Sequence, residues 1–402
     1  MSKKLLILIP LLVIASIAIV ACGQGGSAYE CDDELGCVTY APDEPIRIAS
    51  ALVISGANAQ LGLDSQYGVE IAMDMRGQVA GHDVELQAED DGCNAEGGQA
   101  AGQKIVSDPT IVGVVGTSCS GAGVPMAEVI SDAGYAMVSP SNTSPMLTDP
   151  EQAWKPGYLR TAHNDKIQGA AMANYAYNDL GVRKAGLIHD GDPYTSGLVD
   201  AFGAAFETYG GEVVELTAIN KGDTDMRPVL TSIAAKEPDF LYYPLFTAEC
   251  AFVTQQSKEV AGLENIVLAS ADGCFSDAAA EAIGEAGEGM YFSGPDLSFS
   301  GSLYEDFKVR YMDKYGSDPL SVFHAHAFDA TNMIFQCIEQ VGVQEEDGTL
   351  HVGRQALRDC LYATSGYSGI TGTLSCDEHG DCADAQISVS ELQSGEYVRI
   401  WP

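Results

Sequence analysis

Short apolar runs and amphipathic stretches alternate along most of the chain. Brief β-branched runs are typical of buried strands, whereas apolar residues spaced three and four apart indicate helices. The repeated order of strand then helix predicts a parallel sheet with helices on both faces. The first series predicts strands at 46–53, 84–89, 111–115 and 136–138, with helices at 67–75, 96–107 and 125–132.

The same alternation begins again after residue 165, so we expect a second α/β unit. The chain is also longer than one compact domain usually is, which supports two units. The second series predicts helices at 166–179, 196–209, 227–235 and 248–260 and strands at 184–189, 212–216, 239–243 and 266–269. Helices at 303–315 and 324–340 and short strands at 387–390 and 397–400 follow.

The first residues have the pattern of an export signal. Lys3 and Lys4 precede an uninterrupted apolar run at 5–20, and Cys22 stands directly before Gly- and Ser-rich sequence. This pattern predicts a lipoprotein signal peptide at 1–21, a lipidated Cys22 and a tether at 22–45. The protein is then exported and anchored in a membrane, on the periplasmic or outer cell-surface side. An ordinary signal peptide with an incidental cysteine is the alternative.

The charge balance argues against one class of partner. The chain has 57 acidic and 20 basic residues and a net charge of −37. Nucleic-acid binding requires Lys and Arg to meet the phosphates, so we expect no nucleic-acid partner. The acidic excess favours a well-solvated surface and does not identify a ligand.

The cysteine count agrees with export. Eleven cysteines are present, and lipidation of Cys22 leaves ten, an even number for a protein in an oxidising compartment. The sequence alone does not fix the pairing. Metal binding is the weaker alternative, because no C-x-x-C pair or Cys/His finger spacing occurs. The spacings suggest the pairs Cys31–Cys37, Cys93–Cys119, Cys250–Cys274, Cys337–Cys360 and Cys376–Cys382.

The stretch 111–123, IVGVVGTSCSGAG, predicts a strand, a tight turn and the start of a helix. Such a turn presents backbone N–H groups, a positive helix end and serine hydroxyls at the carboxyl edge of the sheet. We therefore expect Ser120 and its neighbouring amides to hold a ligand carboxylate. A simple helix cap is the alternative interpretation. The stretch lacks the endings of a P-loop and of a nucleophile elbow.

Several short motifs occur together in one order. They are ALVISG at 51–56, EDDGC at 89–93, GTSCS at 116–120, SPSNTSP at 139–145, IHD at 188–190, DFLYY at 239–243, SAD at 270–272 and GTLS at 372–375. Their order and wording resemble the Leu/Ile/Val-binding proteins, the type I periplasmic solute-binding family that delivers branched-chain amino acids to ABC importers. The resemblance covers nearly the whole chain after the signal segment.

The resemblance implies an α/β fold of two Rossmann-like lobes joined by a hinge, the type I periplasmic binding protein fold. It implies crossings near 160–161, 293–294 and 369–371. The lobes are then expected at 46–160 with 294–370, and at 161–293 with 371–402. Cys93 and Cys119 fall where the family's lobe disulfide lies.

The resemblance also implies a ligand site. Ser120 and Thr143 are expected to bind the ligand carboxylate, and the Ser141 carbonyl, the Thr143 hydroxyl and Asp272 its ammonium. Burying an unpaired charge is costly, so a zwitterion needs partners for both charges. The resemblance further implies that Tyr194 and Phe246 close over the ligand, and that Leu61, Cys119 and Phe323 border its side chain.

Four positions depart from the family pattern: Leu61, Asn142, Phe246 and Asp272. Asn142 stands where a small apolar residue is usual, and we expect its side chain to offer a hydrogen bond to a polar ligand. The resemblance therefore does not imply strict selectivity for leucine-type ligands. We expect an amino acid of branched-chain or related type, delivered to an ABC transporter permease, with no cofactor and no metal. A small amide or organic acid is the alternative ligand.

Two other functions are weighed against transport. A hydrolase could in principle combine Ser120 with His189 or His163 and an aspartate, but no motif in the sequence requires that geometry. We therefore expect no enzymatic activity. A ligand-sensing domain for a separate signalling partner is the remaining alternative.

Overall fold

The computed structural model describes residues 29–402. The predicted signal peptide at 1–21, the predicted lipidation at Cys22 and the first part of the tether, 22–28, lie outside these residues. No helix in the part of the chain from residue 29 onward is both long and apolar enough to cross a membrane.

The first sheet has six strands in the order β3-β4-β2-β5-β6-β7. All neighbours in it run parallel except β3 and β4. The run at 111–116 is buried at every position, because helices cover both faces of the sheet. The strands are β2 (Ile46–Leu52), β3 (Gln78–Val79), β4 (His82–Asp90), β5 (Ile111–Gly116), β6 (Ala136–Ser139) and β7 (Tyr158–Arg160).

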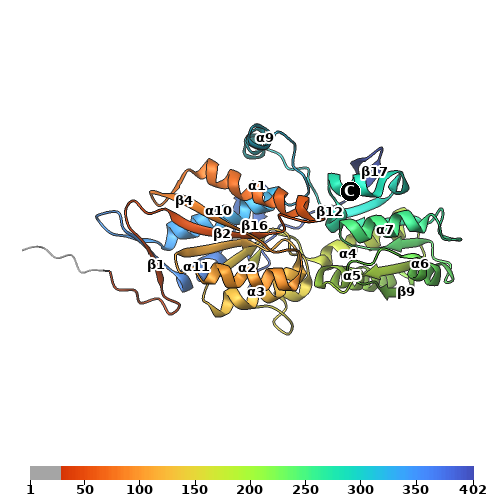
Figure 1. Cartoon of the computed structure of the whole chain (residues 1–402), viewed down its shortest axis with the longest axis horizontal. Coiled ribbons are helices and arrows are strands. Elements are labelled where there is room, and N and C mark those ends of the chain that lie inside the picture. The colour runs from red at the N-terminus through yellow and green to blue at the C-terminus, as the bar shows by residue number, and fades with distance from the viewer. Residues whose placement is uncertain (1–28) are drawn as a thin grey trace, which may run out of the picture. The chain divides into compact units, whose positions relative to one another are not determined.

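Helices enclose this sheet from two sides (Figure 1). One hydrophobic cluster joins α1, α10 and α11 to the strands, and another joins α2 and α3 to the opposite face. The helices are α1 (Ala59–Arg76), α2 (Ala95–Val106), α3 (Ser120–Asp132), α10 (His324–Val341) and α11 (Arg354–Tyr362), with a 3-10 turn η1 (Pro145–Thr148).

The second sheet has seven strands in the order β18-β17-β12-β11-β10-β8-β9. Strands β8 to β12 run parallel, and β17 and β18 add an antiparallel edge. The strands are β8 (Lys184–His189), β9 (Glu212–Ala218), β10 (Phe240–Tyr242), β11 (Val267–Ala271), β12 (Tyr291–Pro295), β17 (Ile387–Gln393) and β18 (Glu396–Trp401).

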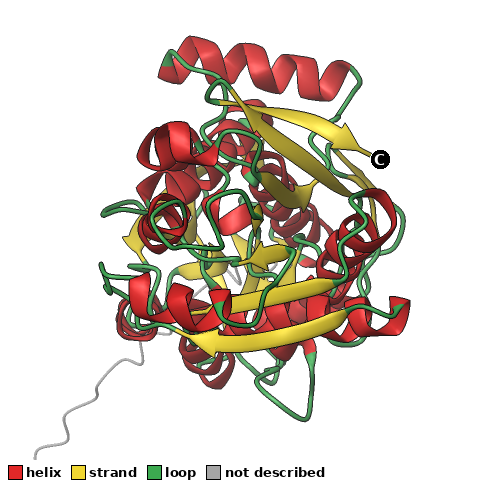
Figure 2. Ribbon diagram, turned by 90° about the vertical axis from the view of Figure 1, so that its right-hand side faces the viewer, coloured by secondary structure: helices red, strands yellow, loops and turns green. Residues whose placement is uncertain are grey.

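Helices again lie on both faces of the strands (Figure 2). Residues of α4 and α5 pack in one cluster, and residues of α6, α7 and α8 pack in another. The two α/β sheets confirm the predicted fold class. The helical segments are α4 (Asp165–Asn174), a π-helical turn η2 (Tyr175–Asp179), α5 (Pro193–Tyr209), α6 (Arg227–Ala234), α7 (Thr247–Ser257), η3 (Asp272–Cys274), α8 (Asp277–Ile283) and η4 (Gly284–Gly287).

The end of the predicted tether is part of the folded body, which corrects the expectation for 22–45. Residues 37–40 form β1, which pairs with β14, and Val38 and Tyr40 belong to the first hydrophobic cluster. These alternate residues bury their side chains, so the segment acts as a half-buried strand. The remaining elements are β1 (Cys37–Tyr40), α9 (Ser302–Tyr315), β13 (Val343–Gln344), β14 (Leu350–Gly353), β15 (Tyr367–Gly369) and β16 (Gly372–Leu374).

The segment after 370 packs with the first sheet. Leu374 and Cys382 belong to the same cluster as Ile46 and Val115, and the Arg160 N–H donates to the Gly380 carbonyl at 2.8 Å. The last crossing to the second sheet therefore lies between 382 and 387, later than the predicted 369–371. The other predicted lobe boundaries stay predictions.

Four of the predicted disulfides are present. They are Cys93–Cys119, Cys250–Cys274, Cys337–Cys360 and Cys376–Cys382. Cys31 and Cys37 are also disulfide-bonded residues, and their pairing with each other stays a prediction. Three of the bridges close loops of 23 to 26 residues, each worth about 3 kcal/mol in the chain-entropy model.

Candidate ligand-binding site

A small cavity lies where the carboxyl ends of strands from both sheets meet, and we call it the central cavity. Its volume is about 20 Å³, room for about one water molecule, so a larger ligand requires its walls to move apart. Eight of the ten predicted ligand residues line it: Leu61, Cys119, Ser120, Ser141, Tyr194, Phe246, Asp272 and Phe323. Ser118 and Gly273 complete the lining.

Hydroxyl groups form one wall of the central cavity. Ser120 begins α3 and is 1 % exposed, and its Oγ accepts a hydrogen bond from the Ser144 N–H at 3.2 Å. The Ser141 hydroxyl donates to the Ser118 carbonyl at 2.9 Å. The positive end of the α3 dipole adds to these groups. This wall suits a carboxylate.

Small residues let this wall form. A Cβ atom on Gly121 would come within 2.2 Å of Asp192 Oδ2, and one on Gly123 would come within 2.4 Å of Asn142 Oδ1. Glycine at the start of α3 therefore allows neighbouring loops to approach the helix closely. This is the physical reason for the glycine-rich turn.

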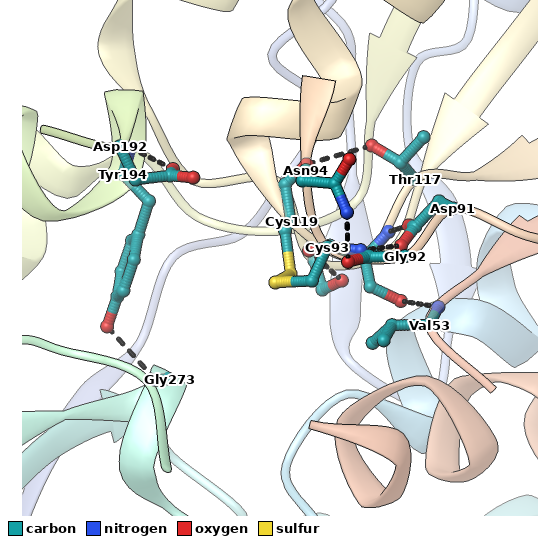
Figure 3. The surroundings of a disulfide bond; sticks show 12 residues. Val53, Asp91, Gly92, Cys93, Asn94, Thr117, Cys119, Asp192, Tyr194 and Gly273 are labelled. Carbon is teal, nitrogen blue, oxygen red and sulfur yellow. Dashed lines mark hydrogen bonds between the residues drawn. A yellow bond between two sulfur atoms is a disulfide. The ribbon is translucent and has the colours of Figure 1, made fainter. Parts of the chain in front are cut away.

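Buried Asp91 and the Cys93–Cys119 disulfide join the loops after β4 and β5 beneath this wall (Figure 3). Asp91 accepts hydrogen bonds from the backbone N–H groups of Cys93 at 2.8 Å and Ser118 at 2.6 Å. The Ser118 hydroxyl in turn accepts from the Val53 N–H at 3.0 Å. Burial raises the pKa of Asp91 to about 7, although these N–H bonds oppose the rise.

Asp272 supplies a negative group on the opposite wall. It follows β11 and is 4 % exposed. Its Oδ1 accepts from Gln168 Nε2 at 2.6 Å and from the Tyr194 hydroxyl at 3.3 Å. Burial raises the pKa of Asp272 to about 6, and the hydrogen bonds from Gln168 and Tyr194 limit that rise.

Apolar groups occupy the rest of the lining. The rings of Tyr194 and Phe246 lie 5.4 Å apart between centroids. The Tyr194 hydroxyl accepts from the Gly273 N–H at 3.0 Å (Figure 3). Leu61 and Phe323 are both less than 9 % exposed. The cavity thus combines a few polar groups with apolar walls, as small-molecule sites do.

Asn142 and Thr143 do not line the central cavity. The Asn142 side chain is fully buried and is satisfied internally, because Nδ2 donates to the Thr117 carbonyl and Oδ1 accepts from the Thr117 hydroxyl, both at 3.0 Å. Thr143 is also fully buried, and its Oγ1 has no hydrogen-bond partner among residues 29–402. The roles of both in ligand binding stay predictions.

Asp165 is a residue that the sequence interpretation missed. It is fully buried beside Thr143, and neither of its carboxyl oxygens has a hydrogen-bond partner within the described chain. Burial raises its pKa well above the ordinary value and the nearby charge of Asp272 raises it further, whereas the Thr143 side chain and the charge of Arg160 oppose the rise. An aspartate at a helix start usually caps the helix, but Asn164 caps α4 here and leaves Asp165 without that role.

Contacts between groups attached to the two sheets enclose the central cavity. Gln60 Oε1 accepts from the Ala278 N–H at 2.8 Å, and the Ser144 hydroxyl donates to the Pro193 carbonyl at 2.8 Å. Lys221 Nζ lies 2.6 Å from Asp192 Oδ2 and donates to the Cys93 carbonyl at 3.3 Å. An occupant can enter or leave only when these contacts break.

No group of three or more acidic, His or Cys side chains suited to a metal ion occurs between residues 29 and 402. His163 Nε2 bonds to Gln168 Oε1 instead of to Ser120. The lining therefore offers hydroxyl groups and a helix end on one side and the carboxylate of Asp272 on the other, an arrangement that suits binding of a small dipolar molecule.

Known proteins share this architecture. The family model described as periplasmic binding protein matches residues 45–396. A Leu/Ile/Val-binding protein homolog from Brucella melitensis is 26 % identical over 370 residues, which cover 88 % of this chain and 93 % of that protein.

Solved structures agree in fold. A leucine-binding protein from Thermotoga maritima superposes with a TM-score of 0.78 at 24 % identity, covering 88 % of this chain and 97 % of that one. A solute-binding protein from R. palustris in complex with benzoate superposes with a TM-score of 0.73 at 21 % identity, covering 89 % and 96 %. The fold thus occurs with different ligands. The chain belongs to the periplasmic binding protein family, and its resemblance to the Leu/Ile/Val-binding proteins is confirmed.

Proposed function

We propose that this protein captures a small amino acid in the central cavity, between the two sheets, and delivers it to an ABC importer. The observation that carries the proposal is the placement of Ser120 and Asp272 on opposite walls of one cavity. Hydroxyls and a helix N-terminus suit the ligand's carboxylate, and a carboxylate suits its ammonium. Because the two charges face different sheets, the ligand would hold the sheets together, so closure is coupled to binding.

The buried carboxyl groups favour an amino acid over a simple organic acid. The fold also occurs in a benzoate complex, so the architecture alone does not select the ligand. Benzoate carries no cation, and it would leave Asp272 buried without a positive partner, whereas Asp165 has the charge of Arg160 nearby. An ammonium group beside Asp272 relieves the burial cost of its carboxylate.

The transport role accounts for the other sequence features. Anchoring through Cys22 would keep the protein beside the permease outside the cytoplasm, and the closed form would be the one that the permease recognises. Catalysis is not part of the proposal, because the Ser120 hydroxyl accepts from a backbone N–H and His163 bonds to Gln168. A sensing role for the same closed form is the second candidate.

A calorimetric screen tests the proposal. The exported protein is first unfolded and refolded to remove any carried ligand, and then titrated with the common L-amino acids, benzoate and acetamide. We expect at least one amino acid of branched-chain or related type to bind with micromolar or tighter affinity, and benzoate to give no heat. Saturable binding of benzoate or acetamide alone would contradict the proposed ligand class.

Asp165→Asn is expected to weaken amino-acid binding by about 10-fold or more, since a hydrogen bond to a charged group contributes about 1.5–3 kcal/mol. The wild type should also release protons on binding, because the ligand's ammonium favours the ionised form of Asp165. Calorimetry in two buffers of different ionisation enthalpy measures that release, and it should be smaller in the variant.

Asp179→Asn is the matched control. It removes the same charge at the exposed end of the following helical turn, so affinity and proton release should be unchanged. The Asp165→Asn protein should melt no lower than the wild type, because it removes a buried carboxyl without a partner. Unchanged affinity in this folded variant would exclude Asp165 from the site.

A further inference from the structure

A lysine outside the lining of the central cavity covers one of its walls. Lys221 stands on the loop after β9, the edge strand of the second sheet, and its side chain is 38 % exposed. Its Nζ lies 5.0 Å from the ring centroid of Phe246, which lines the central cavity. Lys221 therefore lies between solvent and a wall of the cavity.

The Lys221 ammonium contacts loops of both halves of the protein, where each half is one of the two sheets with its helices. In the second half, Nζ lies 2.6 Å from Asp192 Oδ2, on the loop after β8. In the first half, the Cys93 carbonyl, after β4, accepts from Nζ at 3.3 Å. The disulfide fixes Cys93, and a hydrogen bond from the Gly222 N–H to Glu249 at 2.8 Å fixes the lysine loop. Lys221 thus joins two ordered loops.

Asp192 is enclosed where the two halves meet. It is 4 % exposed, and its Oδ1 accepts from the Tyr194 N–H at 3.0 Å (Figure 3). A Cβ atom on Gly121, at the start of α3 in the first half, would come within 2.2 Å of Asp192 Oδ2. A buried carboxylate requires a positive partner, and Lys221 is the cation paired with it. Burial raises the pKa of Asp192, and the charge of Lys221 opposes that rise.

The charge of Lys221 is therefore needed most when the halves are closed. When the halves separate, Gly121 and the Cys93 carbonyl move away, and water can reach Asp192. Closing expels that water, so the carboxylate then depends on Lys221. Without the lysine, the closed form would contain an unpaired buried charge and the open form would not. That difference shifts the equilibrium toward the open form.

We propose that Lys221 is a positioning residue for capture: its ion pair with Asp192, seated against Gly121, holds the halves closed and sets how long the ligand stays bound. The inference rests on the proposed function, because that function needs the central cavity to open and close around the ligand. Lys221 is outside the cavity lining, so it acts on closure and not through a contact with the ligand.

Lys221→Met should release the amino acid identified by the screen about tenfold faster or more, while its association rate stays within about twofold of the wild type. Stopped-flow kinetics measures both rates. Lys236→Met is the matched control, because Lys236 is an exposed lysine just after α6, and both of its rates should be unchanged. A lower melting temperature of ligand-free Lys221→Met together with slower association would show a purely structural role and overturn the proposal.

Gly121→Ala tests the space that the ion pair requires. The added methyl group would meet Asp192 only in the closed form, so ligand affinity should fall about tenfold or more. Alanine favours a helix more than glycine does, so α3 should be retained and the ligand-free protein should melt no lower than the wild type. Unchanged affinity in this variant would contradict the close approach on which the proposal depends.

Hydrogen exchange in the ligand-free protein separates this inference from the identity of the ligand. The Ala278 N–H donates to Gln60 between the halves, so its exchange reports opening. It should exchange about fivefold faster or more in Lys221→Met than in the wild type, whereas the Val114 N–H within β5 should be unchanged. Equal Ala278 exchange in the two proteins would overturn the proposal. A screen that finds no amino-acid ligand would contradict only the proposed function.

Discussion

Asp272→Asn should weaken amino-acid binding more than tenfold, which is a loss of at least about 1.4 kcal/mol. The variant keeps the shape of the side chain but removes the charge that we propose as the partner of the ligand's ammonium. The Tyr194 hydroxyl and Gln168 would still find an oxygen at this position, so the fold should be retained. Titration calorimetry with the best ligand from the screen measures the loss.

The pH dependence of ligand affinity distinguishes the effect of the Asp272 charge from the effect of its side-chain shape. Since burial raises the pKa of Asp272 to about 6, lowering the pH from 7 through 6 protonates this group and should weaken wild-type binding. The Asp272→Asn protein should show a smaller decline over the same range. Asp277→Asn removes an exposed charge from the start of α8, outside the lining of the central cavity, so it serves as the matched control and should bind normally. Equal affinity in wild type and Asp272→Asn would remove Asp272 from the ligand site.

Arg160→Met should destabilise the protein by about 3 kcal/mol, because it removes a fully buried guanidinium from two buried carbonyls and from Asp381, whose own side chain is 28 % exposed. Arg160 is completely buried, and its Nε bonds to Asp381. Its Nη1 donates to the carbonyls of Asn142 at 3.1 Å and Ser144 at 2.8 Å. Arg160 thus fixes the loop that bears Thr143, and equilibrium urea unfolding measures its contribution.

Arg47→Met is the matched control. Arg47 pairs with Asp108 and with Glu85 but its side chain is 30 % exposed, so its removal should cost less than about 1 kcal/mol. The double variant Arg160→Met with Asp381→Leu should recover part of the lost stability, because no unpaired charge is left buried. A loss below 1 kcal/mol for Arg160→Met alone would show that the pair is not a major stabilising contact.

Much of the fold could be predicted from the local pattern of apolar residues. Where an observed helix or strand differs from the prediction, the difference has a physical cause. The period of the apolar residues located most strands to within a few residues. Helix α1, however, begins at Ala59 and not at 67. Gly62 and Gly68 interrupt its apolar pattern because backbone atoms of Val53 and His324 lie within about 2.2 Å of where their Cβ atoms would stand. These contacts are tertiary, so the sequence near the helix start could not have predicted them.

The site shows the same division. Ser120 follows a strand end, which predicted its place at the carboxyl edge of the sheet, whereas Asp272 was assigned to the site through the family resemblance. Asn142 follows a strand end too, yet its amide bonds to Thr117 within the first sheet's loops. Asp165 is the opposite case, because it was left out of the predicted site. Its sequence position, at a helix start, resembles that of a helix-capping residue. Whether a polar side chain is satisfied by its neighbours depends on atoms far away in sequence, which periodicity does not report.

The Cys93–Cys119 disulfide and Asp91 have a consequence for the movement that capture requires. They hold the serine wall in one arrangement before any solute arrives. This half of the site is therefore preorganised and should lose little conformational entropy on binding. Cys250–Cys274 fixes the turn that carries Asp272 in the same way, so capture requires movement of one half against the other and little change within either. The time for which the solute stays bound is then expected to depend on how well the two halves hold together.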